Sequence, residues 1–233
     1  MNLVLTGATG FVGKSLIENL FSEYYVIKAF VRQSSSELPL SVKQVVVGEL
    51  GELGELALDH STGFLREAFY GVDVVVHAAA RVHVMNDDAS NPLTEFRKVN
   101  RDATLFLARL AAESGVKRFV FLSSIKVNGE MTRLGHLFTP DDVHVPDDPY
   151  GLSKYEAEQG LLALAQETGM EVVIIRPPLV YGPGVKANFA SMMKWMGKRV
   201  LLPFGAIHNQ RSLVALDNLV SFISLCADRK KSP

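Results

Sequence analysis

The stretch Thr6-Gly7-Ala8-Thr9-Gly10-Phe11-Val12-Gly13 lies between a short apolar run and a segment whose apolar residues recur at helical spacing. The apolar run, residues 3–5, predicts a buried strand, and residues 15–21 predict a helix. A strand, a glycine-rich turn and a helix form the context in which this pattern binds the pyrophosphate of a dinucleotide. The alternative is a plain turn, but the glycines are spaced three apart and both flanks fit.

Each glycine of this stretch has a physical reason to be there. We expect Gly7 to form the tight turn, Gly10 to let the backbone approach a pyrophosphate, and Gly13 to let the helix pack close to the strand. The free N–H groups at the helix start would then face the anion. Six residues of the stretch are therefore predicted to bind the cofactor: Gly7, Thr9, Gly10, Phe11, Val12 and Gly13.

The bulk properties predict one globular protein with a sizeable core. The 233 residues are 48% hydrophobic and 21% charged, with a formal net charge of -1. No basic stripe indicates nucleic-acid binding, and the histidines and Cys226 lack metal-ligand spacing, so we predict no metal site. A lone cysteine suits a reducing cytoplasm. We expect no signal peptide and no membrane span, because a strand starts at once and residues 72–80 are too short to cross a bilayer.

Strand and helix patterns alternate along most of the chain, which predicts an α/β fold with a Rossmann-type, doubly wound parallel sheet. The expected strands are residues 3–5, 25–31, 44–47, 72–77, 118–124 and 171–176. The expected helices include residues 64–70, 91–114, 150–168, 188–197 and 216–227. We assign residues 1–176 to the dinucleotide-binding domain with the catalytic helix, and residues 177–233 to a small, shortened substrate-binding cap with a closing helix.

Arg32 ends the second expected strand, about 20 residues after the glycines, where an acidic residue would bind the adenosine ribose 2′-OH. Arginine there, followed by three serines at residues 34–36, suits a 2′-phosphate better. NADP is therefore favoured as the cofactor, with NAD as the alternative. The competing interpretation is an exposed polar loop that happens to contain an arginine.

Tyr150 and Lys154 are four residues apart in a predicted helix, which puts a phenol and an ammonium on the same face. A phenol titrates near ~10, and a nearby cation would lower that value towards the range of efficient proton transfer. Alone, this spacing is common in helices. Here the preceding strand ends in the hydroxyls of Ser123 and Ser124, which could hold a carbonyl or sugar oxygen during hydride exchange.

Together these motifs resemble the extended short-chain dehydrogenases/reductases, in particular the NAD(P)-dependent epimerase/dehydratase family that acts on nucleotide sugars. The matching pieces run through almost the entire chain: 6–13, 77–80, 99–100, 123–124, 127–129, Tyr150 with Lys154, 176–177, 181–184 and 211–214 with Asp217. The resemblance implies that Ser124 is the catalytic hydroxyl residue and Tyr150 the acid–base residue. It also implies that Lys154 binds the nicotinamide ribose and tunes Tyr150.

The same resemblance implies further binding residues. For the cofactor they are Arg32, Ala78, Ala79, Ala80, Asn100, Ser123, Tyr150, Lys154 and Pro177. For the substrate they are Ser124, Asn188, Phe189 and Arg211, with the arginine pairing to a diphosphate. Family dehydratases carry Asp-Glu directly after the catalytic hydroxyl residue, whereas this chain has Ile125 and Lys126 there, which argues against sugar dehydration. Asn128 replaces a usual tyrosine.

We therefore expect an oxidoreductase that acts at C4 of a nucleotide-activated sugar, as a 4-epimerase or a 4-keto reductase. One alternative is a reductase of a steroid-like or flavonoid-like carbonyl. Another is a dinucleotide-binding regulatory module without turnover, against which the Tyr150/Lys154 pair argues. The expected partner is a nucleotide sugar, with a homodimer allowed, in the cytoplasm.

Overall fold

The computed structural model of the protein describes residues 1–21, 26–53, 62–82, 91–132, 135–142, 144–185, 191, 193–195, 197–198 and 210–228. Its centre is a six-stranded sheet with the order β3-β2-β1-β4-β5-β6, in which all neighbouring strands are parallel. The strands are β1 (Asn2–Thr6), β2 (Val26–Val31), β3 (Lys43–Val46), β4 (Val74–His77), β5 (Arg118–Leu122) and β6 (Glu171–Ile175). This confirms the predicted doubly wound parallel sheet.

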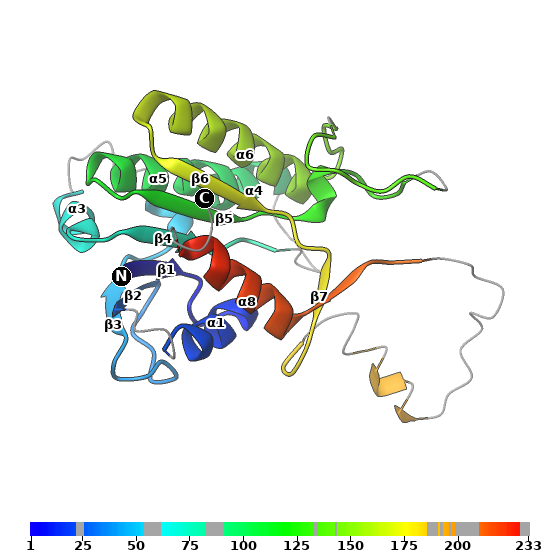
Figure 1. The fold of residues 1–233 in the computed structure, drawn as a ribbon, viewed down its shortest axis with the longest axis horizontal. Coiled ribbons are helices and arrows are strands. Elements are labelled where there is room, and N and C mark those ends of the chain that lie inside the picture. The colour runs from blue at the N-terminus through cyan, green and yellow to red at the C-terminus, as the bar shows by residue number, and fades with distance from the viewer. Residues whose placement is uncertain are drawn as a thin grey trace.

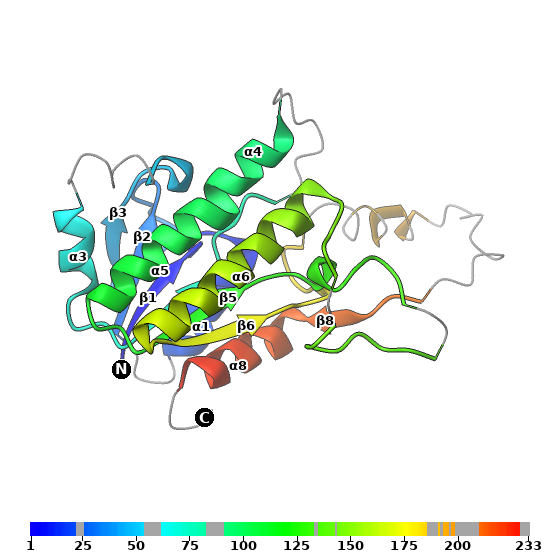
Figure 2. The same cartoon turned by 90° about the horizontal axis from the view of Figure 1, so that it is seen from above.

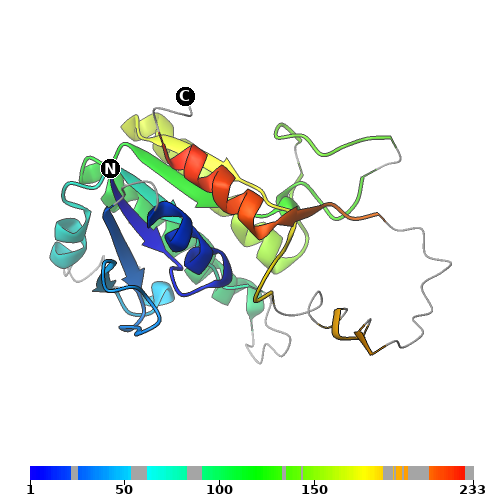
Figure 3. The same cartoon turned by 60° about the horizontal axis from the view of Figure 1, so that its bottom comes forward.

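Helices cover both faces of the sheet (Figures 1 and 2). One face carries α3 (Gly63–Phe69), α4 (Pro92–Arg97), α5 (Ala103–Glu113) and α6 (Pro149–Thr168). The other face carries α1 (Phe11–Phe21) and α8 (Leu216–Ala227), which lie side by side (Figure 3). Short turns η1 (Leu50–Glu52) and η3 (Ile125–Val127) follow β3 and β5. Within the described ranges, no helix has the length and apolarity needed to cross a bilayer.

Two hydrophobic clusters form the core, one on each face of the sheet. The cluster under α1 and α8 includes Leu5, Leu16 and Leu219, and the cluster under α3, α5 and α6 includes Phe69 and Leu161. Because parallel strands are buried on both faces, their sequences are nearly continuous apolar runs, as the sequence analysis assumed. The carboxyl ends of the strands meet at one edge of the sheet, and this edge carries the glycine-rich turn and the start of α6.

The ends of α6 are fixed by local chemistry. The Asp148 side chain caps the helix by accepting the Gly151 N–H at 3.0 Å, and Pro149 occupies the first turn. Gly169 ends the helix in the left-handed conformation, with φ at 73°. The bounds of α8 coincide with the predicted residues 216–227.

Two features of the fold differ from the expectation. The pattern predicts one helix over residues 91–114, whereas a π-helical segment, η2 (Lys98–Asp102), separates α4 from α5. A second sheet of β7 (Leu179–Tyr181) and β8 (Leu213–Ala215) was not predicted, because its two strands are far apart in sequence. The division at residue 176 stays a prediction, and α8 packs into the same cluster as β1 and α1. Of the helix expected at 188–197, residues 191, 193–195 and 197 are described and are helical, and the other positions lie outside the described residues.

Candidate active site

The glycine-rich turn after β1 is closed so tightly that only glycine fits at two positions. Gly7 has a φ of 73°, and a Cβ placed on it would lie 2.7 Å from the backbone nitrogen of Ala79. A Cβ on Gly13 would lie 2.1 Å from the Gly7 carbonyl oxygen, so the first turn of α1 can approach the turn only without a side chain. The Gly10 N–H donates to the same oxygen at 2.9 Å. The helix start is thereby held against the end of β1.

A buried histidine ties the end of β1 to the end of β4. His77 Nδ1 lies 2.9 Å from Thr6 Oγ1, and His77 Nε2 lies 3.0 Å from Thr104 Oγ1. The Thr104 hydroxyl donates to the Asn100 carbonyl at 2.8 Å, so it accepts the proton of Nε2, and Thr6 donates to Nδ1. Burial lowers the pKa of His77 to about 3, and the ring is therefore neutral. His77 acts here as a fixed spacer between β1 and α5.

The segment after β4 contains the predicted residues Ala78, Ala79 and Ala80. The Ala79 N–H donates to Thr6 Oγ1 at 3.1 Å. The Asn100 side-chain amide binds both backbone polar groups of Arg81, the residue that follows this segment. Asn100 Oδ1 accepts the Arg81 N–H at 2.9 Å, and its Nδ2 donates to the Arg81 carbonyl at 3.0 Å. The predicted contact of Asn100 with the cofactor stays a prediction; its observed contacts fix the backbone beside the glycine-rich turn.

Ser124 and Tyr150 come together where β5 ends and α6 begins. Ser124 caps η3 by accepting the Lys126 N–H at 3.3 Å, and its side chain is hydrogen-bonded to the Tyr150 phenol. Phe96 of α4 packs edge-on against the Tyr150 ring, with the ring centres 5.9 Å apart. These contacts place a hydroxyl and a phenol side by side at the carboxyl edge of the sheet, where a substrate oxygen could bind both.

The ammonium of Lys154 faces β5 at the base of this site. Lys154 Nζ donates to the Leu122 carbonyl at 2.9 Å and lies 4.5 Å from the centre of the Phe121 ring. The side chain is 1% exposed, and burial lowers its pKa to about 7, against the raising effect of Glu158. The expected lowering of the Tyr150 pKa is not seen: burial of the phenol raises it, and this outweighs the Ser124 hydrogen bond.

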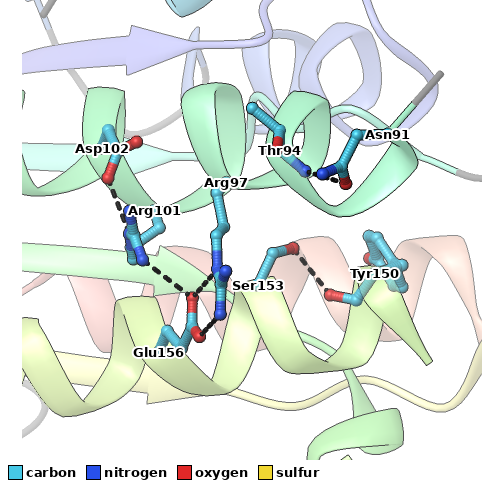
Figure 4. Close-up of polar contacts among 8 residues, drawn as sticks. All are labelled: Asn91, Thr94, Arg97, Arg101, Asp102, Tyr150, Ser153 and Glu156. Atoms are coloured by element: carbon cyan, nitrogen blue, oxygen red, sulfur yellow. Dashed lines mark hydrogen bonds and ion pairs between the residues drawn. The ribbon is translucent and has the colours of Figure 1, made fainter. Parts of the chain in front are cut away.

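The opposite side of α6 is joined to α4 and η2 by polar contacts (Figure 4). Glu156 accepts hydrogen bonds from Arg97 and Arg101, the latter at 3.2 Å. Nearer the site, the Ser153 hydroxyl donates to the Tyr150 carbonyl at 2.8 Å and lies 3.0 Å from Asn100 Nδ2. The π-helical segment that carries Asn100 is thus connected to the backbone of the first turn of α6.

The Ser123 side chain is hydrogen-bonded to a buried group on α6. Its hydroxyl donates to Glu158 Oε1 at 2.5 Å, and Glu158 also accepts Arg176 Nη2 at 2.6 Å. The predicted contact of Ser123 with the cofactor stays a prediction, and its hydroxyl is 2.5 Å from a carboxylate in this structure. Pro177 follows Arg176 and its carbonyl accepts the Ile125 N–H at 3.1 Å. Glu158 and Arg176 were not predicted as site residues, although Glu158 is one helical turn from Lys154.

Of the other predicted binding residues, the structure describes Arg32 and Arg211 but not Asn188 and Phe189. Arg32 is exposed and its Nη1 lies 3.3 Å from Glu49 Oε1. Arg211 is exposed and lies two residues before β8. Asn188 and Phe189 lie outside the described residues. Among the described residues, no group of three or more metal-binding side chains comes together.

Comparison with known families agrees with this geometry. The profile of the NAD dependent epimerase/dehydratase family matches residues 3–233. The chain belongs to this family. It is 49% identical over 233 residues to a UDP-glucose 4-epimerase of Vibrio cholerae, an alignment that covers 99% of this chain and 68% of that protein.

The chain is also similar to a second curated protein and to a solved structure. An N-acetyl-α-D-glucosaminyl-diphospho-ditrans,octacis-undecaprenol 4-epimerase of Escherichia coli O157:H7 is 30% identical over 227 residues, covering 95% of this chain and 62% of that protein. The structure of the Thermus thermophilus UDP-glucose 4-epimerase in complex with NAD has a TM-score of 0.78 at 21% identity, covering 97% of this chain and 74% of that chain. This similarity shows the fold.

The residues around the glycine-rich turn fit the dinucleotide after which the family is described. The sterically closed turn at Gly7 and Gly13 leaves backbone N–H groups at the start of the 11-residue helix α1. The family's acidic pair is replaced by Ile125 and Lys126, and Lys126 Nζ lies 3.4 Å from Asp148 Oδ1. Asn128, at the place of the usual tyrosine, accepts a hydrogen bond from Arg176 Nη1 through its Oδ1, at 3.1 Å. Both departures are thus integrated into the packing around α6.

Proposed function

We propose that the protein is an NAD-dependent 4-epimerase of a diphosphate-activated hexose. The observation that carries the proposal is the convergence of Ser124, Tyr150 and Lys154 at the carboxyl edge of the sheet, in a chain 49% identical to a UDP-glucose 4-epimerase. UDP-glucose and its 4-epimer are the substrates proposed first. A bound nicotinamide would supply the chemistry by taking a hydride from the sugar carbon and returning it.

In this proposal Tyr150 moves the proton of the sugar 4-hydroxyl, because its half-buried phenol is a titratable group beside the Ser124 hydroxyl at the carboxyl edge of the sheet. Ser124 shares a hydrogen bond with that phenol and would orient the sugar oxygen towards it. Lys154 holds a positive charge below the phenol. An ammonium has three N–H donors, and one of them reaches the Leu122 carbonyl, so we expect the others to bind the hydroxyls of a ribose.

A 4-keto reductase would use the same three residues, and it differs from an epimerase by consuming a reduced cofactor in each turnover. The replacement of the acidic pair by Ile125 and Lys126 supports both over a sugar dehydratase. The 30% identity to the E. coli enzyme favours a second substrate class, a hexosamine carried on a polyprenyl diphosphate. The two substrate classes share a diphosphate next to the sugar, which Arg211 would bind through its planar fork, with Asn188 and Phe189 nearby in sequence.

For the cofactor we propose NAD. Arg32 predicts NADP, but NADP preference has no support among the relatives, and the matching family is described as NAD dependent. The Glu49 carboxylate beside Arg32 also places a negative charge where a 2′-phosphate would have to bind. A homodimer and a cytoplasmic location stay predictions.

The decisive test is conversion of UDP-glucose by the purified protein, followed by NMR of the sugar anomeric protons. An epimerase produces the 4-epimer from UDP-glucose without consuming added NADH, whereas a reductase leaves UDP-glucose unchanged and oxidises NADH only when a UDP-activated 4-keto sugar is supplied. The lipid-linked substrate, tested in detergent, decides between the two substrate classes. Native mass spectrometry of the same sample reads retained cofactor and bound sugar. Bound dinucleotide without turnover of either substrate would contradict the proposal and favour a regulatory module.

A further inference from the structure

Two buried charged side chains, Lys154 and Glu158, lie with the half-buried Arg176 between α6, β5 and the end of β6. Glu158 is 0% exposed and Lys154 is 1% exposed. Arg176 Nε lies 3.0 Å from Glu158 Oε1, and Arg176 Nη2 lies 2.6 Å from Oε2. Ser123 donates to the same carboxylate at 2.5 Å. The buried carboxylate of Glu158 therefore binds the half-buried Arg176 directly and lies one helical turn beyond the buried Lys154, whose ammonium feels its charge.

Among the described residues, Glu158 is the acidic group whose charge acts on Lys154. Tyr150 and Glu158 lie on the same helix, His77 approaches from β4, and Arg176 follows β6. His77 is neutral, because burial lowers its pKa to about 3. A buried ammonium without a counter-charge loses its proton readily, since desolvation disfavours the charged form. Glu158 therefore supplies the negative charge that opposes the desolvation of Lys154.

Arg176 divides its guanidinium between Glu158 and the loop that follows β5. Its Nη1 donates to Asn128 Oδ1 at 3.1 Å and to the Pro140 carbonyl at 3.2 Å, and Asn128 Nδ2 donates to the Thr139 carbonyl at 2.7 Å. Bidentate binding holds Arg176 close to the carboxylate. The arginine thus fastens the loop to α6 and at the same time competes with Lys154 for the charge of Glu158.

We propose that Glu158 is a positioning residue of the active site, which increases the charged fraction of the Lys154 ammonium near neutral pH, and that Arg176 limits this effect by binding the same carboxylate. The inference rests on the proposed role of Lys154 in the function. It concerns the protonation of the free protein, however, so its test gives an answer even if the protein does not turn over a sugar.

The experiment is an NMR pH titration of the Lys154 side chain in protein labelled with 13C at lysine Cε, assigned with Lys154→Met. In Glu158→Gln the midpoint should move to lower pH by about one unit or more, because an opposite charge nearby is lost. In Arg176→Gln it should move to higher pH, because a like charge is lost. The matched control is Glu156→Gln, on the same helix and also paired with arginines, but facing α4 and η2 (Figure 4). It should leave the midpoint unchanged.

A second readout is the affinity for NAD at pH 6 and pH 8. Glu158→Gln should lose affinity between these values more steeply than wild type and Glu156→Gln, since less of its Lys154 is charged at pH 8. Glu158→Gln leaves the half-buried Arg176 without its carboxylate, which can prevent folding. The double variant Glu158→Gln/Arg176→Gln removes both charges, and its midpoint should lie below that of Arg176→Gln.

Opposite shifts in the two single variants, or the lower midpoint of the double variant, support the proposal. Equal Lys154 titrations in Arg176→Gln and in the double variant would overturn it, as would an unchanged midpoint in a folded Glu158→Gln protein. Absence of sugar turnover in wild type, with these shifts present, would contradict the proposed function and leave the role of Glu158 intact.

Discussion

The two halves of the site are built by different means. The nucleotide half, formed by β1, α1, β2 and β4, is closed by backbone atoms, with a hypothetical Cβ of Gly13 only 2.1 Å from the Gly7 oxygen. The proposed catalytic half, formed by β5, α6 and β6, is held by side-chain contacts among the buried Ser123 and Glu158 and the half-buried Arg176. Backbone closure depends on neighbours in sequence, whereas the side-chain contacts depend on residues that only the fold brings together.

This difference has a functional consequence. A backbone cradle provides affinity through N–H groups whose positions vary little, so it tolerates changes elsewhere in the site. The proposed catalytic half places charges next to a phenol and an ammonium that titrate, so we expect its activity to depend on pH. Variants in one half should therefore separate binding of the dinucleotide from chemistry.

The largest expected effect is in the catalytic half. Tyr150→Phe keeps the packing against Phe96 and removes the hydroxyl that would handle the proton. Loss of acid–base catalysis should lower kcat by about 10²-fold or more. The dinucleotide affinity should stay near wild type, because the cradle at Gly7 and Gly13 is untouched. Steady-state kinetics and fluorescence titration of NADH check the two parts, and turnover at the wild-type rate would remove Tyr150 from the mechanism.

The converse variant lies in the nucleotide half. Gly13→Ala places a methyl group against the Gly7 oxygen, and overpacking of this kind costs about 1–3 kcal/mol. We expect a loss of NAD affinity of roughly 10- to 100-fold with a lower Tm, measured by calorimetry and thermal unfolding. Gly63→Ala is the control, since a Cβ on Gly63 meets nothing within 4 Å. Equal NAD affinities of both variants would mean that the close approach at Gly13 does not shape the binding site.

How far the sequence predicts each half follows from the same difference. The glycine-rich turn, the Asp148 cap and the bounds of α8 depend on residues close in sequence, and all three agree with the structure. The π-helical segment at Lys98–Asp102 could not be predicted, because apolar spacing does not distinguish it from the α-helix around it. The Glu158–Arg176 ion pair connects α6 to the end of β6. Asn128, which is 48 positions before Arg176 in the sequence, accepts a hydrogen bond from the same arginine. Only the folded chain brings such partners together, so the sequence does not predict them.

A smaller effect is expected for the substrate side. Arg211→Ala should weaken binding of UDP-glucose by roughly tenfold, because a hydrogen bond to a charged group contributes about 1.5–3 kcal/mol. NAD affinity should not change, since Arg211 lies beside β8 and outside the nucleotide half. Arg66→Ala, which removes an exposed arginine paired with Glu113 on the α3 side, is the control in the same calorimetric titration. Equal affinity of Arg211→Ala and Arg66→Ala for UDP-glucose would place Arg211 outside the substrate site.

The smallest effect concerns the one charged side chain that the sequence places in the nucleotide half for specificity. Arg32 pairs with Glu49 across exposed positions, with side chains 72% and 59% exposed, and such pairs contribute about 0–1 kcal/mol. An arginine held so loosely can change the choice between NAD and NADP by less than tenfold, since ~1.4 kcal/mol is a factor of ten. We expect wild type to bind NADH at least as tightly as NADPH. Glu49→Gln should improve NADPH binding a few-fold by removing a negative charge, and Arg32→Asp should weaken it by a similar factor. Fluorescence titrations of both reduced cofactors against the three proteins test this, and a wild type that binds NADPH tenfold more tightly would show that a single side chain, and not the backbone cradle, decides the cofactor.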